Sequence, residues 1–397
     1  MRKYLICAVI TVLCLLCYLL FEPMFIYNFG WEPLTNDQKS KSEVIHDSTF
    51  YRPILLTQKY LDDSIALKTP GLSVAVGING KLVWSSTRGY ADVETKKLVT
   101  PNTAFRIGST SKAVTSIGLG ILLEQGKLGL DDTIAPGIMD KTITIKQLAS
   151  HTSGIRNYGM CFCFPVWEYY NNDEYTSVKE AVKIFNDDPL LFEPGTDFSY
   201  SSYNFTALSA AMEHAAGIEF TEFMESMVFR KAGMVNTGFD KQNVNIDRAE
   251  FYDVQTNIYK KAFTVDNSNK WAGGGMLSTP SDLVILGNAI LTGSIINPET
   301  FKTLTTPVRL ANGEINEQNY ALGWRSGELD LLDVKAKVTI LHHGGTATGS
   351  TALWIIVPEY NLTAAIMINR SVEGFPLFDI LLPIVEYFVN ELNTSRD

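Results

Sequence analysis

The chain has 397 residues, of which 46% are hydrophobic and 29 are glycine. This composition is typical of a packed protein and excludes a mainly disordered chain. The formal net charge is −10 and no basic run follows Met1-Arg2-Lys3, so nucleic-acid binding is not expected. The length suffices for a membrane segment together with one large domain or two smaller ones.

The N-terminus carries an uncharged hydrophobic segment, residues 4–21, directly after two cations. Its length is at the lower limit for a helix that crosses a bilayer. A cleaved signal peptide is one alternative, but the segment is longer than a typical signal-peptide core and no small-residue cleavage site follows it. We therefore expect a signal anchor, with residues 1–3 in the cytosol and the domain on the extracytoplasmic side, lumenal or extracellular. A mitochondrial inner-membrane anchor is a second alternative, although the segment is neither amphipathic nor rich in arginine.

Only two of the five cysteines, Cys161 and Cys163, lie outside the hydrophobic segment. This excludes a disulfide framework, and a Cys-x-Cys pair without a nearby histidine is a poor metal site. We expect neither a metal nor another cofactor. Four Asn-x-Ser/Thr triplets would be glycosylation acceptors outside the cytosol, and they begin at Asn204, Asn361, Asn369 and Asn393.

The patterns along the chain predict strands at both ends of the domain and helices between them. A polar connector covers 22–50, and the domain covers 51–392. Asn79-Gly80 is the strongest hairpin signal. Strands are expected at 71–78, 81–86, 337–341, 351–357 and 362–368. Helices are expected at 52–67, from Ser109 to Gly126, at 178–185, 205–216 and 221–229, from a Ser281-Asp282 cap to Leu291, and at 372–392, with an aromatic loop at 158–175. The order predicts an α+β domain whose antiparallel sheet is formed by the N- and C-terminal parts, flanked by helices, with an inserted, mainly helical lobe.

Ser109 and Lys112 are the strongest candidates for chemistry. Residues three apart at the start of a helix share a face, so the lysine can reach the serine oxygen. The helix N-terminus also supplies free N–H groups where an anion could form. By itself Ser-x-x-Lys is a weak signal, because Ser109 could be only a helix cap and Lys112 only a solvated residue. The helix is apolar nearly all round, however, and burial would lower the pKa of the lysine.

Two more motifs complete a known pattern: Tyr200-Ser201-Ser202 after a turn, and His343-Gly344-Gly345-Thr346 after a strand. With Ser109-x-x-Lys112 they resemble the serine β-lactamase and penicillin-binding-protein family, in its class C, esterase and D-aminopeptidase branch. Supporting phrases are Leu148-Ala149-Ser150-His151-Thr152-Ser153-Gly154 and Trp271-Ala272-Gly273-Gly274-Gly275. The resemblance covers about residues 51–390 and is strongest to animal serine β-lactamase-like proteins, one of which is mitochondrial and forms filaments.

The resemblance implies that Ser109 attacks a carbonyl to form an acyl-enzyme, with Lys112 and Tyr200 sharing the role of general base. It implies an oxyanion site made by the N–H groups of Ser109 and Thr346, next to Gly345. It also places His343, rather than His342, as a charge or hydrogen-bond donor beside the tyrosine and a substrate carboxylate.

Ser202 departs from the family pattern, because many relatives have asparagine at this position. A hydroxyl cannot both donate and accept as an amide does, so recognition of β-lactams or peptide amides is in doubt. The resemblance implies a membrane-anchored serine hydrolase for small peptide, amide or ester substrates, and it allows a homo-oligomer. The alternative is a catalytically weak or inactive scaffold, or a filament-forming protein, on the same fold. His151 is interpreted as a structural loop residue.

Overall fold

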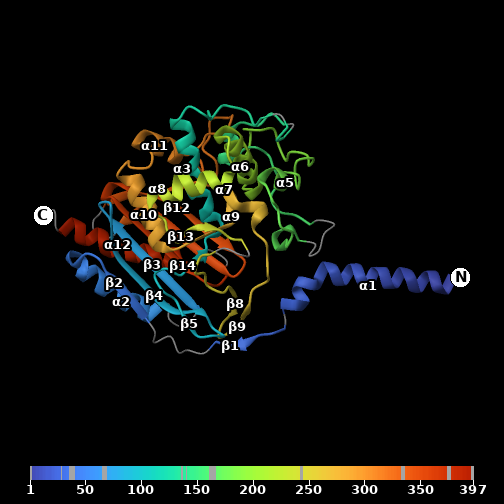
Figure 1. Ribbon diagram of the computed structural model, residues 1–397, viewed down its shortest axis with the longest axis horizontal. Helices are drawn as coiled ribbons and strands as arrows, with labels where there is room; N and C mark the ends of the chain where they lie inside the picture. Colours follow the sequence, from blue (N-terminus) through green and yellow to red (C-terminus); the bar gives the residue numbers. More distant parts are fainter. Residues whose placement is uncertain are drawn as a thin grey trace.

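The computed structural model describes residues 2–27, 29–34, 41–64, 69–135, 137–139, 141–160, 167–241, 245–331, 336–372 and 377–394, and in these the central sheet has eight antiparallel strands (Figure 1). Seven of them lie in the spatial order β11 (Arg325–Leu331), β12 (Ala336–Ala347), β13 (Ser350–Val357), β14 (Leu362–Ile368), β3 (Gly71–Ile78), β4 (Lys81–Asp92) and β2 (Lys41–Ile45). The eighth, β5 (Lys97–Leu98), pairs with β4.

The two ends of the domain meet in the middle of this sheet. β14 pairs with β3 over their whole length, with Ile366 opposite Val74. The hairpin between β3 and β4 turns at Asn79 and Gly80, which both have positive φ as such a turn requires. The predicted sheet, formed by the N- and C-terminal parts, is confirmed.

Each face of the sheet is covered by helices. Val74 and Val76 of β3 face α2 (Tyr51–Ser64) and α12 (Phe378–Thr394) in one hydrophobic cluster. The intervening Ala75 and Gly77 face the other side, because side chains alternate along a strand. There α10 (Pro280–Leu291) packs so closely that a Cβ on Gly77 would lie 2.5 Å from Val284.

The inserted lobe lies between β5 and β11 and is mainly helical, as predicted (Figure 1). Its helices are α3 (Ser111–Glu124), α4 (Ile145–Ala149), α5 (Val178–Val182), α6 (Ser202–Ala216), α7 (Phe220–Met224), the π-helical η4 (Glu225–Phe229), α8 (Arg230–Ala232), α9 (Trp271–Gly274), α10 and α11 (Pro298–Thr305). Short 3₁₀ helices are η1 (Ser48–Phe50), η2 (Gly108–Thr110), η3 (Glu168–Tyr170), η5 (Ser268–Lys270) and η6 (Pro358–Tyr360). Two small sheets join β6 (Phe105–Arg106), β10 (Met276–Ser278) and β7 (Gly238–Phe239), and β1 (Glu32–Pro33), β9 (Ile258–Lys261) and β8 (Tyr252–Gln255).

Several local predictions differ from the structure: the strand predicted at 81–86 continues to Asp92, and the helix predicted at 372–392 begins at Phe378. The connector expected at 22–50 contributes strands, because β2 pairs with β4 and β1 with β9. The cap of α10 is Thr279, whose side chain accepts from the Asp282 N–H at 3.1 Å, so Ser281-Asp282 lies inside the first turn. β12 continues through Ala347, six residues beyond the predicted end, because pairing with β13 keeps its glycines extended.

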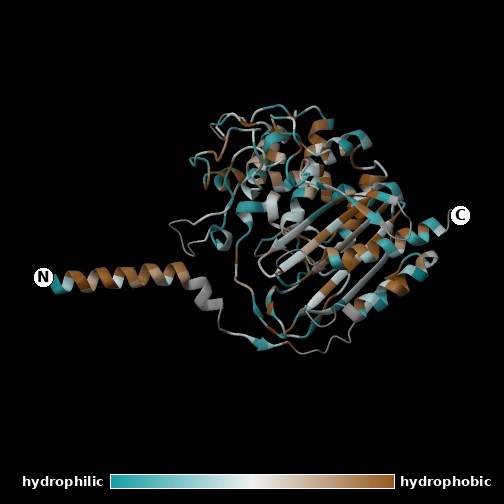
Figure 2. Ribbon diagram, turned by 180° about the vertical axis from the view of Figure 1, so that it is seen from behind, coloured by the Kyte–Doolittle hydropathy of each residue, from teal (hydrophilic) through white to brown (hydrophobic). Residues whose placement is uncertain are grey.

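The N-terminal helix α1 (Arg2–Tyr27) projects away from the body of the protein (Figure 1). Within residues 2–21 an 18-residue stretch has a mean hydropathy of 2.7, and none of it is buried. Figure 2 shows this stretch as almost continuously hydrophobic, in contrast to the two-faced helices of the domain. By length and composition it is able to cross a membrane.

The glycosylation triplets differ in exposure. Asn204 and Asn369 are completely buried, and Asn369 accepts from the Gly71 N–H at 2.6 Å and donates to the Tyr90 carbonyl at 3.0 Å. The folded domain has no room for a glycan at these two positions, which corrects the expectation. Asn361 is exposed and Asn393 is half-buried.

Candidate active site

The turn that carries Ser109 lies directly against the end of β12. Gly108 has a φ of +50°, and a Cβ on it would lie 2.7 Å from the carbonyl carbon of Thr346. A Cβ on Gly345 would lie 2.0 Å from the carbonyl oxygen of Ile107 and 2.7 Å from the backbone nitrogen of Ser109. Glycine at both positions therefore lets two backbone segments touch, which holds Ser109 beside Thr346.

The edge of β12 is open where the turn docks. β11 pairs with β12 only as far as Arg325 opposite His342, so no strand of the described residues pairs with the last residues of β12 on that side. The Thr110 hydroxyl donates to the His343 carbonyl at 3.1 Å and fixes the turn to this edge. Thr110 is buried whereas Ser109 is half-buried, so Ser109 has access to the space outside the turn.

Lys112 is completely buried beneath Ser109. Its Nζ lies 3.1 Å from both the Ser109 and Ser202 hydroxyls, and it also donates to the Gly273 carbonyl. The contact expected from the three-residue spacing is therefore present. Burial lowers the pKa of Lys112, and the neighbouring Tyr200 opposes this shift only in part. A lysine in this state can accept a proton from the serine.

Tyr200 lies close to the same two side chains. The Lys112 Nζ is 4.9 Å from the centre of its ring, and Arg325 is 5.3 Å away. Burial raises the pKa of the Tyr200 phenol, but the charges of Lys112 and Arg325, with hydrogen bonds from Lys112 and Ser109, lower it overall. A phenol with a lowered pKa is a second group able to take the serine proton.

Arg325 is a site residue that the sequence analysis missed. It begins β11, and its guanidinium lies 3.3 Å from His343 Nε2 while donating to Gln318 at 2.8 Å. No local motif marks it. Only the pairing of Arg325 with His342 across the β11–β12 hairpin would have placed it next to the site.

Of the two roles predicted for His343, a charge or a hydrogen bond, the structure does not support the charge. Its Nδ1 contacts the Gly344 carbonyl at 2.7 Å, which makes Nδ1 the donor and leaves Nε2 to accept from the Tyr320 hydroxyl at 2.9 Å. Burial, and then the charge of Arg325, depresses the pKa of His343 far below its usual value. The imidazole is therefore neutral, its ring centre is 6.4 Å from that of Tyr200, and the positive charge beside the tyrosine comes from Arg325.

Strand alternation separates the two neighbouring histidines. His343 faces the site, whereas His342 contacts Phe378 of α12 on the opposite face of the sheet, at 4.8 Å between ring centres. Burial lowers the pKa of His342 to about 3. The choice of His343 over His342 as the neighbour of the site agrees with this geometry.

His151, predicted to be a structural loop residue, packs directly against the site. Its ring is 4.2 Å from the Tyr200 ring and 4.6 Å from the Tyr320 ring, measured between centres. Its Nδ1 accepts from the Ser201 N–H at 3.3 Å. Burial holds its pKa well below the usual value, so it is a neutral residue that positions Tyr200.

Ser202 contacts the buried lysine of the site. As the first residue of α6 it places its hydroxyl 3.1 Å from Lys112, and its N–H donates to the Asn157 side-chain oxygen at 3.0 Å. Asn157, which sequence reasoning also missed, lines the cleft described below. An amide is therefore present at the site, supplied by a different segment of the chain.

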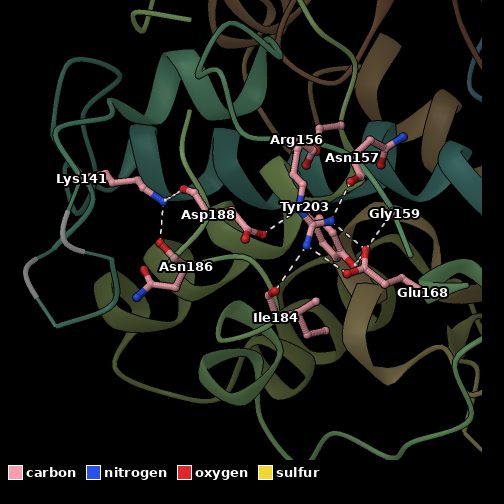
Figure 3. Close-up of polar contacts among 10 residues, drawn as sticks. Lys141, Arg156, Asn157, Gly159, Glu168, Ile184, Asn186, Asp188 and Tyr203 are labelled. Carbon is pink, nitrogen blue, oxygen red and sulfur yellow. Dashed lines mark hydrogen bonds and ion pairs between the residues drawn. The ribbon is translucent and has the colours of Figure 1, made fainter. Parts of the chain in front are cut away.

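A hub of polar contacts holds the segment that carries Asn157 (Figure 3). Arg156 forms a two-point ion pair with Glu168, at 2.7 and 3.0 Å, and a second ion pair with Asp188 at 2.7 Å. Glu168 also accepts from the Gly159 N–H and the Tyr203 hydroxyl. These contacts tie the start of the aromatic loop to η3 and α6. Cys161, Cys163 and the rest of 161–166 lie outside the described residues.

A cleft of about 280 Å³ opens over Ser109. Its lining includes Ser109, Tyr200, Ser202, Thr346 and, from the aromatic loop, Tyr158 and Tyr169. An adjoining hollow of about 470 Å³ shares Tyr169, Thr346 and Thr348 with it. The described ranges contain no group of three metal-ligating side chains. The geometry is that of a buried amine and a phenol behind an accessible serine hydroxyl.

A beta-lactamase family model matches residues 57–381, a range that contains every predicted site residue. The chain belongs to the beta-lactamase family. Within it, the chain is 30% identical over 385 residues to the human (Homo sapiens) serine beta-lactamase-like protein LACTB, mitochondrial, covering 73% of this chain and 69% of that protein. It is 26% identical over 317 residues to penicillin-binding protein 4* of Bacillus subtilis (strain 168), covering 75% and 68%.

Solved structures agree on the fold. D-amino acid amidase from Ochrobactrum anthropi SV3 superposes with a TM-score of 0.70 at 20% identity, covering 86% of this chain and 99% of that one. The α+β, β-lactamase/transpeptidase-like fold implied by the sequence motifs is confirmed. As a member of this family, the protein is a β-lactamase-like serine hydrolase.

Proposed function

We propose that the protein is a membrane-anchored serine hydrolase that forms an acyl-enzyme on Ser109 with small peptide, amide or ester substrates. The observation that carries this proposal is the contact of Lys112 Nζ with the Ser109 hydroxyl at 3.1 Å. A buried lysine with a lowered pKa, next to a tyrosine whose pKa is also lowered, offers two acceptors for the serine proton.

In the first step the Ser109 oxygen bonds to the substrate carbonyl carbon while its proton passes to the Lys112–Tyr200 pair. The tetrahedral intermediate then expels the amine or alcohol, which takes that proton as it leaves. In the second step water attacks the acyl carbon and loses a proton to the same pair; the bond from that carbon to the Ser109 oxygen then breaks, the pair returns the proton to this oxygen, and a carboxylic acid leaves. Lys112 and Tyr200 each shift the pKa of the other, so we assign the proton to the pair rather than to either residue.

The oxyanion would be bound by the backbone N–H groups of Ser109 and Thr346. The close approach that Gly108 and Gly345 permit supports this assignment, since it brings the two segments together at the cleft. Loss of one such donor typically slows acyl transfer about 100- to 1,000-fold. Arg325 takes the place of a charged His343 in stabilising the tyrosine.

Labelling tests the nucleophile. We expect intact-protein mass spectrometry to detect one covalent adduct after incubation with a fluorophosphonate, and the adduct to be absent from Ser109→Ala. Ser111→Ala is the matched control. Ser111 lies two residues after Ser109, is completely buried, and its hydroxyl has no hydrogen-bond partner among the described residues. If the folded wild-type protein takes up no probe or ester acyl group, the alternative of an inactive scaffold or filament protein on this fold is favoured.

The membrane anchor is part of the proposal. Residues 4–21 would cross the bilayer, with residues 1–3 in the cytosol and the domain on the extracytoplasmic side. The relatives named mitochondrial make an inner-membrane location the alternative. If the domain is extracellular, protease added to intact cells should remove it. If the domain is lumenal, sealed microsomes should protect it from added protease. Co-fractionation with mitochondria alone would contradict both of these locations.

A further inference from the structure

A second buried lysine, Lys270, borders the cleft over Ser109. It ends η5, directly before α9, and is only 6% exposed. Its Nζ lies 4.9 Å from the centre of the Tyr169 ring and 5.3 Å from that of Tyr158. The Tyr169 carbonyl is 3.4 Å away, a weak hydrogen bond. Among the described residues no carboxylate is within ion-pair distance of this ammonium.

The acidic groups whose charge acts on Lys270, Asp240 and Asp266, are already bound elsewhere. Asp240 forms ion pairs with Arg106 at 2.6 Å and Arg248 at 2.9 Å. Asp266 accepts from the backbone N–H of Ser268 at 2.8 Å and from its hydroxyl. Neither carboxylate forms an ion pair with the lysine, so in its charged form Lys270 would gain most from an anion bound in the cleft.

The charge of the cleft contrasts with that of the protein. The whole chain has a formal net charge of −10, yet among the described residues that line the cleft Lys270 is the single charged side chain. An ammonium that is largely shielded from water, on the wall of a cavity without acids, attracts an anionic ligand strongly.

The position of Lys270 in the cleft indicates which part of the substrate it meets. The leaving group must take its proton near Tyr200 and Lys112. Lys270 instead contacts the ring of Tyr169, a residue that also lines the adjoining hollow. The part of the substrate that extends toward Tyr169 is then the acyl part.

We propose that Lys270 binds a carboxylate on the acyl part of the substrate, so that the hydrolase selects small peptides, amides or esters with an acidic acyl group. This inference rests on the proposed function, because it assigns a substrate class to the same site. It makes Lys270 a specificity-determining residue rather than a catalytic one.

The protonation state of Lys270 gives the proposal a second, independent signature. Burial lowers its pKa to about 7, and Arg106 adds to the shift. The ionisable groups that act on it are Arg106, Asp240, Asp266 and Lys112, with the Tyr158 and Tyr169 rings in contact. Below pH 7 the lysine is charged and binds an anion, and above pH 7 it is increasingly neutral. Affinity for an acidic acyl group should therefore fall as the pH rises through this value.

The test compares two substrates on the full-length protein in detergent: N-succinyl-alanine p-nitroanilide and N-acetyl-alanine p-nitroanilide, each as D- and L-forms. We expect Lys270→Met to reduce the succinyl-to-acetyl ratio of kcat/KM about 10-fold or more, mainly through KM. Lys270→Arg should restore part of the ratio. Lys241→Met is the matched control, because Lys241 is an exposed lysine that contacts neighbouring Trp271 outside the cleft. It should leave the ratio unchanged.

A binding measurement covers the case in which Lys270→Met does not fold. In Ser109→Ala protein, calorimetry should show that the preference for the succinyl over the acetyl compound declines between about pH 6 and about pH 8, around the Lys270 pKa. A ratio that is the same in folded Lys270→Met and wild type, or a preference that does not change with pH, would overturn the inference. If wild type hydrolyses neither compound and takes up no fluorophosphonate, the proposed function fails instead, and the binding experiment still decides the role of Lys270.

Discussion

Replacing Lys112 by methionine is expected to lower kcat/KM for an ester substrate about 100- to 10,000-fold, the usual effect of removing a general base. Methionine fills nearly the same buried space but cannot accept the Ser109 proton. The loss should appear in the rate of Ser109 acylation, measured by stopped-flow with a chromogenic ester.

The same variant should change the pH dependence. In wild type the Lys112–Tyr200 pair must lose a proton to act, so the rate falls as the pH decreases. The Lys112 charge helps to lower the pKa of Tyr200 against the effect of burial. Without that charge the Tyr200 pKa rises, and the residual activity of Lys112→Met should require a higher pH than wild type.

Lys127→Met is the control for Lys112→Met, because Lys127 is exposed just beyond the end of α3. Its kinetics and pH profile should match wild type. Circular dichroism must show that Lys112→Met is folded. A folded Lys112→Met protein that acylates at the wild-type rate would exclude the lysine as a base and leave Tyr200 to act alone.

Gly345→Ala is expected to destabilise the protein by about 3 kcal/mol or more and to abolish acylation of Ser109. The new Cβ would lie 2.0 Å from the Ile107 carbonyl oxygen and 2.7 Å from the Ser109 nitrogen. Both contacts are with backbone, so relief requires β12 and the Ser109 turn to move apart. That movement would separate the two N–H groups assigned to the oxyanion site.

Gly327→Ala, on the adjacent strand β11, is the control for Gly345→Ala. A Cβ there would meet only Ile340 at 3.5 Å, an ordinary van der Waals contact. Urea unfolding and fluorophosphonate labelling of the two variants give the comparison. If Gly345→Ala and Gly327→Ala are equally stable and equally labelled, the close backbone contact between the Ser109 turn and β12 is not needed for stability or for acylation.

The fold was largely predictable because its signals are local and repeated. The short apolar runs of β3 and β14 and the Asn79-Gly80 turn can each be recognised from neighbouring residues. The predictions failed where pairing with distant residues decided the outcome. β2 is a strand because β4 offers a free edge, and β12 is long because β13 accompanies it. Neither partner can be recognised from the segment itself.

For the site, the sequence determined which residues could react: the spacing of Ser109 and Lys112 on one helical turn, and the motifs around Tyr200 and His343. The charges and partners of these residues depend on the complete fold. Burial makes His343 neutral, the hairpin brings Arg325 beside Tyr200, and the hub around Arg156 brings Asn157 to Ser202. The reason is physical: helix geometry links residues a few positions apart, whereas pKa values and ion pairs depend on the solvent exclusion and neighbours that the complete fold creates.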